Sequence, residues 1–432
     1  MFKNFVSGGF VASLVMAGSA AASGFALIEQ SGSGLGNAFA GGAASAEDAS
    51  TIFYNPAGMS RLSGKQLVLA VSAIKPSVQF TGAMTTPVTL QAAGTASGGD
   101  AGSWALLPNA YFAMEVNPQT RIGLGINAPF GLQTKYDANW MGRFQAVKSK
   151  LQTINLNPSV SYQVSDRISL GAGLNYQRID GELSSVSNYS ALASGALGAN
   201  LSGLSTLIGS DSAWGYNAGA LFNFTPQARL GIAYRSRIKY NLSGTVSFAN
   251  RPAALNALLP DQPVTLAVTM PDSFSVSGFH QVSDKWDFMA DATWTGWSVF
   301  QQLNILKASG ASLGAPTPEK WKDTWRVSLG ASYHYNEAWT ARTGLAFDQA
   351  PVQDAYRTVR IPDANRTWLS FGGQYKPDKS DAIDFGYAHL FVSNAPLSQN
   401  AAVNTDLAGK GYLLGSYNNS VDILSVQYAH SF

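Results

Sequence analysis

The segment from Ile154 to Val164 alternates between apolar and polar residues without exception. Its even-numbered positions hold Ile, Leu, Pro, Val, Tyr and Val, and its odd-numbered positions hold Asn, Asn, Ser, Ser and Gln. Residues 168–177 repeat the pattern. An alternation of period two is typical of a β-strand with one apolar face and one polar face. Because such segments recur almost to the last residue, the sequence predicts an all-β fold.

The composition indicates which kind of all-β protein this is. Charged residues make up 12% of the 432 residues, about half of the roughly 25% that globular domains carry. The chain has no cysteine, and it has no run of eighteen apolar residues that would predict a transmembrane helix. Few charges and short alternating strands predict a barrel whose apolar face contacts lipid and whose polar face lines a lumen. The net charge of +2 indicates no nucleic-acid partner.

The first residues are typical of a secretory signal peptide. Lys3 supplies a positive start, residues 10–16 form a short apolar run, and the alanines at 20–22 offer a small-residue cleavage site. We therefore predict a signal peptide over 1–22 and a mature chain that begins at Ser23. Export without cysteine fits the outer membrane of a Gram-negative bacterium, which is the predicted location.

The mature chain divides into two predicted regions. Residues 23–63 are rich in Gly, Ala and Ser and show no sustained alternation, so we interpret them as a plug, or hatch, inside the lumen. Residues 64–432 are predicted to form the barrel. Its fourteen predicted strands are 66–80, 104–116, 120–128, 150–164, 167–181, 212–224, 228–246, 266–282, 285–307, 320–336, 338–351, 365–376, 381–394 and 418–432. Short turns alternate with long loops, so the predicted fold class is a 14-stranded antiparallel transmembrane β-barrel with an N-terminal plug.

Three local patterns add detail. The chain ends on Phe432 after an alternating strand, which resembles the signal that the barrel assembly machinery recognises. Tryptophans near strand ends predict aromatic girdles at the membrane interfaces. They are Trp286, Trp294, Trp297, Trp321, Trp325, Trp339 and Trp368. In the long loop 182–211, leucines three to five residues apart predict a short amphipathic helix, which either captures ligand or packs on its own loop.

The ordered motifs of the chain resemble the FadL family of outer-membrane transporters for long-chain fatty acids and other hydrophobic compounds. The triplet Asn55-Pro56-Ala57 is similar to the NPA motif of the family's hatch, and residues 123–132 (GLGINAPFGL) are similar to its third strand and the loop after it. Further similar segments are 234–236, 297–302, 322–326, 342–348 and 361–363. The resemblance therefore covers nearly the whole mature chain.

The resemblance implies a mechanism. A monomeric barrel holds the hatch, and a hydrophobic molecule is captured between extracellular loops and then bound deeper, near the hatch. After the hatch rearranges, the molecule leaves sideways into the outer-membrane lipid through a gap where the third strand kinks. Uptake is spontaneous. The family's N-terminal residues line the ligand site, which here implies Phe25 and Leu27.

Two residue types at the end of the third predicted strand are relevant to whether this strand kinks. Pro129 and Gly131 stand at the end of the third predicted strand. Proline removes a hydrogen-bond donor from the strand ladder, and glycine marks bulges or bends. Together they predict either an ordinary loop start or a break in pairing that opens the barrel wall, and the resemblance favours the break.

Strand parity also places six cations in the lumen, since a charge on the lipid face at mid-bilayer costs roughly 2–4 kcal/mol. They are Arg235, Arg237, Lys322, Arg326, Arg342 and Arg366. Two roles stay open for each cation. It binds the carboxylate of a ligand, or it pairs with Asp348, Asp384, Glu47 or Asp48 and fastens the hatch.

Several functions compete at this stage. Uptake of fatty acids is favoured by the inward cations, and uptake of neutral aromatic hydrocarbons through the same barrel is the first alternative. A lipase-type enzyme is disfavoured, because no Gly-x-Ser-x-Gly motif and no cysteine occur and the four histidines lack metal-ligand spacing. A general porin is disfavoured by the plug. We therefore predict a transporter rather than an enzyme, with no metal and no cofactor.

Overall fold

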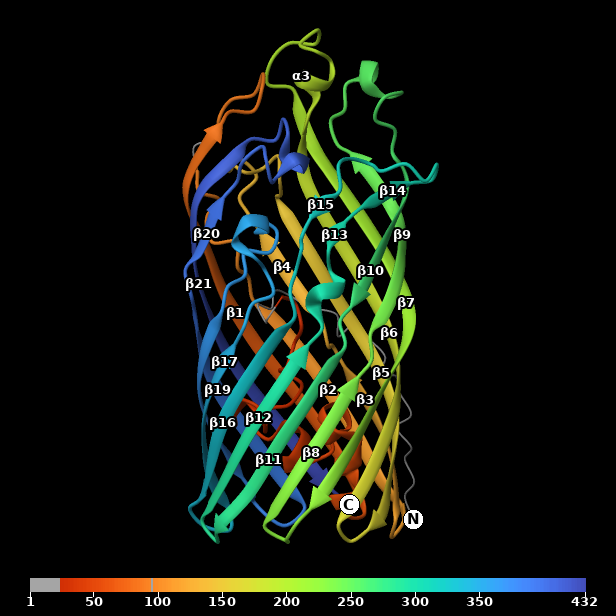
Figure 1. The fold of residues 1–432 in the computed structure, drawn as a ribbon, viewed down its shortest axis with the longest axis vertical. Coiled ribbons are helices and arrows are strands. Elements are labelled where there is room, and N and C mark those ends of the chain that lie inside the picture. Colours follow the sequence, from red (N-terminus) through yellow and green to blue (C-terminus); the bar gives the residue numbers. More distant parts are fainter. Residues whose placement is uncertain (1–23, 95) are drawn as a thin grey trace, which may run out of the picture.

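The computed structural model describes residues 24–94 and 96–432, so the predicted signal peptide 1–22 lies outside the described residues. The chain forms one closed antiparallel barrel of fourteen wall strands around the segment that precedes β1 (Lys65–Thr86) (Figure 1). Closure is direct, because β1 pairs with β2 (Ala105–Asn117) on one side and with the last strand, β21 (Tyr412–Ser431), on the other. Both predictions, the closed barrel and the enclosed N-terminal segment, are confirmed.

The other wall strands follow in chain order, and four of them are interrupted. They are β3 (Thr120–Asn127) with β4 (Gly131–Lys135), β5 (Lys148–Ser165), β6 (Ile168–Asn188), β7 (Ser202–Asn223), β8 (Ala228–Arg235) with β9 (Ile238–Phe248), β10 (Gln262–Met270) with β11 (Ser273–Ser283), β12 (Trp286–Thr295) with β14 (Ile305–Lys307), β16 (Thr324–His334), β17 (Trp339–Asp348), β18 (Arg366–Tyr375) and β19 (Asp381–Val392).

The remaining elements are short. Inside the barrel lie η1 (Leu35–Asn37), α1 (Gly42–Ser45), α2 (Thr51–Tyr54) and η2 (Pro56–Arg61). The loops hold α3 (Tyr189–Leu192), η3 (Ala253–Leu255), η4 (Trp297–Val299), β13 (Gln302–Leu303), β15 (Thr317–Pro318), η5 (Asp354–Tyr356), β20 (Ala395–Ser398) and η6 (Thr405–Leu407). None of the helices in the described part of the chain is long and apolar enough to cross a membrane.

The alternation on β5 separates its two faces as the sequence predicts. Ile154 and Val160 expose 43% and 45% of their surface on the outside, whereas Asn155 and Asn157 are fully buried inside. At one end of the barrel the strands join by tight turns and the C-terminus lies there, and at the other end the loops are long (Figure 1). The tight turns mark the periplasmic end and the long loops the extracellular end.

The helix predicted in loop 182–211 is present only as the four residues of α3, and the rest of the predicted leucine stripe is not helical. The barrel wall continues through most of this segment, since β6 runs to Asn188 and β7 begins at Ser202. Leu204 and Leu207 pair across the two strands with Val186 and Leu183, and only the four residues of α3 are helical. Cross-strand pairing of these apolar residues therefore outweighs their helical spacing.

The interruption between β8 and β9 also overturns a prediction. Strand parity carried through this segment places Arg237 in the lumen, but the break at Ser236 resets the parity. Arg237 is 45% exposed on the outside, and its Nε lies 2.9 Å from Asp272 Oδ1. Asp272 stands in the neighbouring break between β10 and β11, after Pro271, which lacks the N–H that a continuous strand would need.

The predicted tryptophan girdle holds only in part. Trp286, Trp325 and Trp339 are 42–48% exposed on the outer surface, as interface residues should be. Three of the predicted girdle residues, Trp297, Trp321 and Trp368, are instead buried inside the barrel. Trp297 and Trp321 lie outside regular wall strands, so strand position does not decide their direction.

Inward-facing glycines allow the barrel wall to contact the hatch closely. A Cβ atom added to any of these residues would lie 3.0 Å or less from a neighbouring atom, which for nearly all of them belongs to the hatch. They are Gly123, Gly171, Gly219, Gly231, Gly330, Gly344, Gly372 and Gly386. The hatch therefore touches the wall closely on several sides, with its backbone at Gly171, Gly231 and Gly344.

Candidate functional site

The Asn55-Pro56-Ala57 triplet anchors the hatch from within. Asn55 is fully buried, and its Nδ2 donates to the carbonyls of Ala43 (2.7 Å) and Ala220 (3.0 Å). Its Oδ1 accepts from the Ala57 N–H at 3.0 Å and so caps η2, where Pro56 stands at the first position. One side chain thus joins two parts of the hatch to β7.

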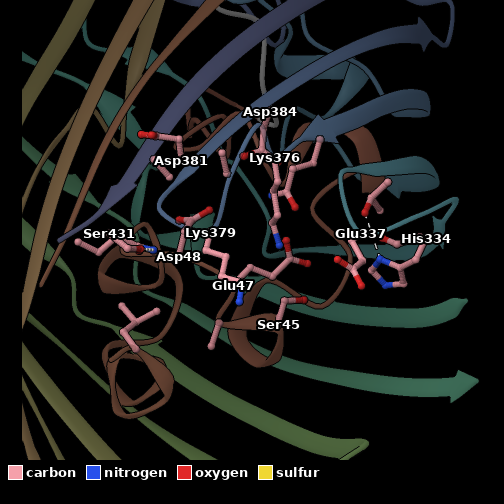
Figure 2. A pocket seen from close by; sticks show the side chains of 18 of the residues that line it. Ser45, Glu47, Asp48, His334, Glu337, Lys376, Lys379, Asp381, Asp384 and Ser431 are labelled. Carbon is pink, nitrogen blue, oxygen red and sulfur yellow. Dashed lines mark hydrogen bonds between the residues drawn. The ribbon is translucent and has the colours of Figure 1, made fainter. Parts of the chain in front are cut away.

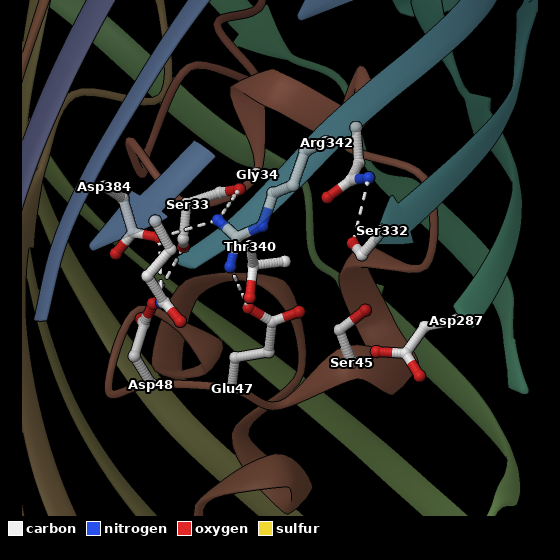
Figure 3. Close-up of polar contacts among 12 residues, drawn as sticks. Ser33, Gly34, Ser45, Glu47, Asp48, Asp287, Ser332, Thr340, Arg342 and Asp384 are labelled. Atoms are coloured by element: carbon white, nitrogen blue, oxygen red, sulfur yellow. Dashed lines mark hydrogen bonds and ion pairs between the residues drawn. The ribbon is translucent and has the colours of Figure 1, made fainter. Parts of the chain in front are cut away.

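Arg342 fastens the hatch to the wall by ion pairs (Figure 3). Its Nη1 lies 2.7 Å from Asp384 Oδ1 and 2.8 Å from the Ser33 carbonyl, and its Nη2 lies 2.7 Å from Glu47 Oε2. Ser33 in turn donates to Asp48 Oδ2 at 2.8 Å. Of the two roles predicted for this cation, the observed contacts are those of the fastening role.

Three more predicted cations hold buried partners. Arg326 Nη2 donates to the Ala38 carbonyl at 2.6 Å. Arg235 Nη2 donates to the Phe53 carbonyl at 2.9 Å, and its guanidinium lies over the Phe53 ring. Arg366 pairs with Asp363 and lies 3.6 Å from Asp348 Oδ2. Each of these side chains has at least one contact that fixes the hatch or an inward loop.

The lumen prediction for Lys322 rests on strand parity, which does not apply to this residue. This residue lies two positions before β16 begins, and it is exposed. Strand parity does not govern the direction of a side chain that lies outside the strand. Its neighbour Trp321 is buried instead.

The first described residues, Gly24–Ile28, form an N-terminal arm that differs from the hatch body, residues 29–64. The arm pairs with the interruption between β3 and β4. Leu27 N–H donates to the Pro129 carbonyl at 2.8 Å, and Gly131 N–H donates to the Phe25 carbonyl at 2.9 Å. Gly24 N–H donates to Asp363 Oδ2 at 2.8 Å.

The barrel wall is incomplete beside this arm. β3 pairs with β2 only from Ala110 onward, and β4 pairs with β5 but not with β2. Residues 105–109 of β2 therefore have a partner in β1 and none in β4. Pro129, which has no N–H, stands inside the interruption, and a Cβ atom at Gly131 would lie 3.0 Å from the Leu27 side chain.

An aromatic cluster surrounds the side chain of Phe25. The ring centroids of Trp297, Trp321, Phe300 and Phe130 lie 4.7, 5.4, 5.7 and 6.2 Å from that of Phe25. Most of these contacts are edge-to-face, the arrangement that the charge distribution of aromatic rings favours. The arm thus inserts a ring into a preformed apolar box.

This cluster lies between two cavities. The upper cavity, of about 80 Å³, is on the extracellular side and is almost wholly apolar. It is lined by Phe25, Leu132, Leu151, Ile179, Leu183, Leu207, Leu242, Val264, Leu266, Val268, Phe300 and Leu303, with Arg360 at its edge. The lower cavity, of about 140 Å³, borders the hatch and includes Leu27, Tyr54, Phe130, Trp297, Arg235 and Arg326.

Two cations, Lys150 and Arg360, border the upper cavity, and Arg360 belongs to the loop that folds into the barrel. Arg360 donates to the Gln145 carbonyl (2.8 Å), to Ser149 Oγ (3.0 Å) and to the Lys148 carbonyl (3.2 Å), and no carboxylate of the described residues lies within 4.0 Å of it. Burial lowers the pKa of Arg360 to about 10, so it carries its charge at neutral pH. Its charge is therefore available to an anion at the edge of an apolar cavity.

A third cavity, of about 800 Å³, opens below the hatch at the periplasmic end (Figure 2). Lys376, Lys379 and Asp381 from the barrel rim lie around Glu47 and Asp48 of the hatch body. This vestibule is polar and charged, unlike the upper cavity. The hatch body separates it from the lower cavity.

The upper and lower cavities contain some of the ligand-site residues that the sequence predicts. Phe25 lines the upper cavity, and Leu27, Arg235, Arg326, Pro56 and Pro129 line the lower one. Arg342 faces the vestibule and Lys322 lines none of the three cavities. The sequence analysis missed Arg360, although it precedes the family-like segment 361–363, and it misplaced Trp297 and Trp321.

Comparisons with known proteins agree with this architecture. Residues 13–432 match the family described as outer membrane protein transport protein (OMPP1/FadL/TodX). The long-chain fatty acid transport protein of Escherichia coli K12 is 30% identical over an alignment of 425 residues that covers 92% of this chain and 94% of that protein. A 47 kDa outer membrane protein of Pasteurella multocida is 35% identical over 395 residues, 87% of this chain and 89% of that protein.

Solved structures give the same result. The crystal structure of a Pseudomonas aeruginosa FadL homologue superimposes with a TM-score of 0.87 at 30% identity, over 95% of this chain and all of that one. The Ralstonia pickettii toluene transporter TbuX superimposes with a TM-score of 0.67 at 20% identity, which shows the shared fold. This chain belongs to the FadL family of outer-membrane proteins, transporters rather than enzymes, which carry hydrophobic compounds across the outer membrane of Gram-negative bacteria.

Proposed function

We propose that this protein takes up long-chain fatty acids and that Arg360 binds their carboxylate while the upper cavity holds the start of the hydrocarbon chain. The observation that carries the proposal is a half-buried guanidinium beside an almost wholly apolar cavity, with no carboxylate of the described residues within 4.0 Å of it. Sites for amphipathic ligands combine apolar walls with a few placed polar groups. The fatty-acid transport proteins among the relatives, at about 30% identity, support the same substrate class.

The proposed route runs from the upper cavity to the interruption between β3 and β4. A chain entering the aromatic box displaces Phe25, which joins the upper cavity to the lower one. Because the arm is hydrogen-bonded to Pro129 and Gly131, its movement frees the backbone at the gap in the wall. The ligand then leaves sideways into the lipid. The hatch rearrangement is confined to the arm, since glycine contacts and ion pairs hold the hatch body on several sides.

The second candidate substrate is a neutral aromatic hydrocarbon. The box around Phe25 favours it, because an unsubstituted ring has the shape and the edge-to-face contacts of the phenyl group that now fills the box. In this case Arg360 has no part in binding.

One competition experiment separates the two substrates. The refolded barrel in detergent is titrated with a fluorescent long-chain fatty acid, which is then displaced by unlabelled fatty acid or by toluene. We expect fatty acid to compete and Arg360→Gln to weaken its binding about tenfold, the size of a charge-assisted hydrogen bond. Arg237→Gln, which removes an exposed arginine, is the control. Competition by toluene with no effect of Arg360→Gln would favour the hydrocarbon instead.

A further inference from the structure

The outer surface of β4, β5 and β6 carries a group of cations near the interruption between β3 and β4. We call Lys135, Lys148 and Lys150 the lysine cluster. Ser149 and Leu151, which alternate with Lys148 and Lys150, face the interior and line the upper cavity, and Lys150 also borders that cavity. Strand parity directs the lysine side chains to the opposite, outer face of the wall, where Lys135 is exposed and the other two are half-buried.

The pairing of these strands brings like charges together. Lys135 stands directly opposite Lys148 across β4 and β5, an arrangement that destabilises an antiparallel pair unless a counter-ion is present. Lys150 stands opposite Glu182 on β6, but the carboxylate lies 2.6 Å from Lys148 Nζ. Of the three lysines, Lys148 is the one that forms an ion pair with a carboxylate of the described residues.

The neighbouring charges do not neutralise the cluster. Arg178 on β6 is paired with Asp180 at 2.8 Å, so that carboxylate is already engaged. Within the described part of the chain, no carboxylate lies within 4.0 Å of Lys135 Nζ or Lys150 Nζ. The outward-facing charged side chains of β4 to β6 in this half of the barrel are four cations and two carboxylates, which leaves a local excess of positive charge.

The height of the cluster places it at the level of lipid headgroups. Lys150 lies twelve residues along β5 from Tyr162, an exposed aromatic residue near the periplasmic end of the outer face, where Val164 follows it. At about 3.3 Å per residue and a tilt of about 40°, this is roughly 30 Å along the barrel axis, more than the apolar band of about 25 Å. The lysines therefore stand just beyond the hydrocarbon, on the extracellular side.

The other side of the barrel lacks such a cluster. The arginines of β16, β17 and β18 (Arg326, Arg342 and Arg366) are all buried inside. The outward positions beside them hold Trp325, Leu345, Phe347 and Leu369. The described outer faces of β16 to β18 therefore lack the excess of positive charge that the lysine cluster gives to the wall beside the interruption between β3 and β4.

We propose that the lysine cluster binds the phosphate groups of an anionic lipid of the outer leaflet and holds that lipid beside the gap in the barrel wall. Phosphate oxygens supply the missing counter-ion for Lys135 and Lys150, and the acyl chains of the same lipid lie against the apolar face of β5 below. This partner is a structural lipid, separate from the transported ligand, so the proposal stands whatever the substrate is.

The test compares retention of two lipids by the intact barrel. Detergent-solubilised protein is mixed with bis-phosphorylated lipid A or with its dephosphorylated form, and bound lipid is counted by native mass spectrometry. We expect the wild type to retain the phosphorylated form preferentially. Lys135→Gln, Lys148→Gln and Lys150→Gln should each weaken retention about fivefold, the usual contribution of one lysine near an anionic surface. The triple cluster variant, which combines the three changes, should weaken retention further.

A matched control removes the same number of lysines at the opposite end. The triple variant Lys65→Gln, Lys376→Gln and Lys379→Gln changes the periplasmic rim and should retain lipid A as the wild type does. Heat-dependent migration in gels verifies that each variant has assembled. Equal retention of both lipids by the wild type, or unchanged retention by the triple cluster variant, would overturn the proposal. So would binding of inorganic phosphate by these lysines without retention of lipid A.

Discussion

The hatch body and the N-terminal arm lie in the same lumen but are held in different ways. Buried side chains from several wall strands hold the body. Arg342 forms ion pairs with Asp384 and Glu47. Arg229 donates to the Ala44 carbonyl at 2.6 Å, and Gln427 donates to Asp48 at 2.8 Å. The arm is held to the wall and an inward loop by two backbone hydrogen bonds and by the bond from Gly24 N–H to Asp363. Tyr54 of the hatch body donates to the Ile28 carbonyl, and the aromatic box surrounds Phe25.

The difference indicates which part of the hatch can move at a low cost in free energy. Displacing the body would leave buried charges unpaired and would separate backbone from the inward glycines, at a cost of several kcal/mol. Displacing the arm breaks a few hydrogen bonds and vacates an apolar box that a hydrophobic ligand can refill. The contacts therefore indicate a plug in two parts, a fixed body and an arm that a ligand can replace.

The largest expected effect comes from locking the arm. Ala26 and Phe130 form an antiparallel bridge, so the variant Ala26→Cys with Phe130→Cys has suitable spacing for a disulfide in a chain that has no other cysteine. If the arm must move, oxidation should abolish fatty-acid uptake by cells and reduction should restore it. Uptake is measured with a radiolabelled fatty acid under both conditions.

The control cross-link joins two wall strands. Ser72 and Ser425 stand opposite each other on β1 and β21 with their Oγ atoms 2.6 Å apart, so Ser72→Cys with Ser425→Cys adds a disulfide away from the arm. Uptake through this variant should not depend on its oxidation. Full uptake through the oxidised arm variant would show that the arm does not have to move.

A second, smaller effect is expected when the body is loosened. Arg342→Gln leaves Asp384 buried without its ion partner, and breaking a buried pair in this way costs about 3–5 kcal/mol. We expect the hatch to be cleaved faster by added protease and the barrel to open more often in planar-bilayer recordings. Arg237→Gln breaks a half-exposed pair, worth about 1 kcal/mol or less, and should change neither. Equal protease resistance of both variants would contradict a body fixed by Arg342.

The sequence predicts the barrel well because alternation is a local signal. Asn155 and Ile154 differ in polarity, and the structure buries one and exposes the other. The same rule places Arg326 and Arg342 inside, since both lie within strands. It fails for Lys322 and Arg237, because a parity rule ends where a strand ends or breaks.

The site residues outside the strands could not be predicted in this way. Arg360 reaches the upper cavity because the loop between β17 and β18 folds inward, and Trp297 reaches Phe25 because the chain leaves the wall after β12. Both positions depend on contacts between segments far apart in the chain. No periodic pattern records such contacts, whereas the resemblance to a family did point to the neighbouring segments 297–302 and 361–363.

The smallest expected effect is a change of fatty-acid affinity with pH, at the step in which the ligand binds before the arm moves. Glu319 lies in the loop before β16, accepts a hydrogen bond from Trp321 Nε1 at 3.0 Å and interacts electrostatically with Arg360. Burial raises the pKa of Glu319 from 4.5 to about 8, so the group is neutral at pH 7 and becomes a carboxylate as the pH rises through 8. The new negative charge then competes with the ligand carboxylate for Arg360, whose pKa of about 10 keeps it protonated up to pH 9.

Fatty-acid affinity should therefore fall about three- to tenfold between pH 7 and pH 9, the effect of one added charge at close range in a protein interior. Glu319→Gln removes the titrating group and should bind with nearly constant affinity over the same range. A wild-type affinity that does not change with pH, or a Glu319→Gln variant that loses affinity as the wild type does, would exclude Arg360 and Glu319 as neighbours of the bound carboxylate and leave the movement of the arm as a separate question.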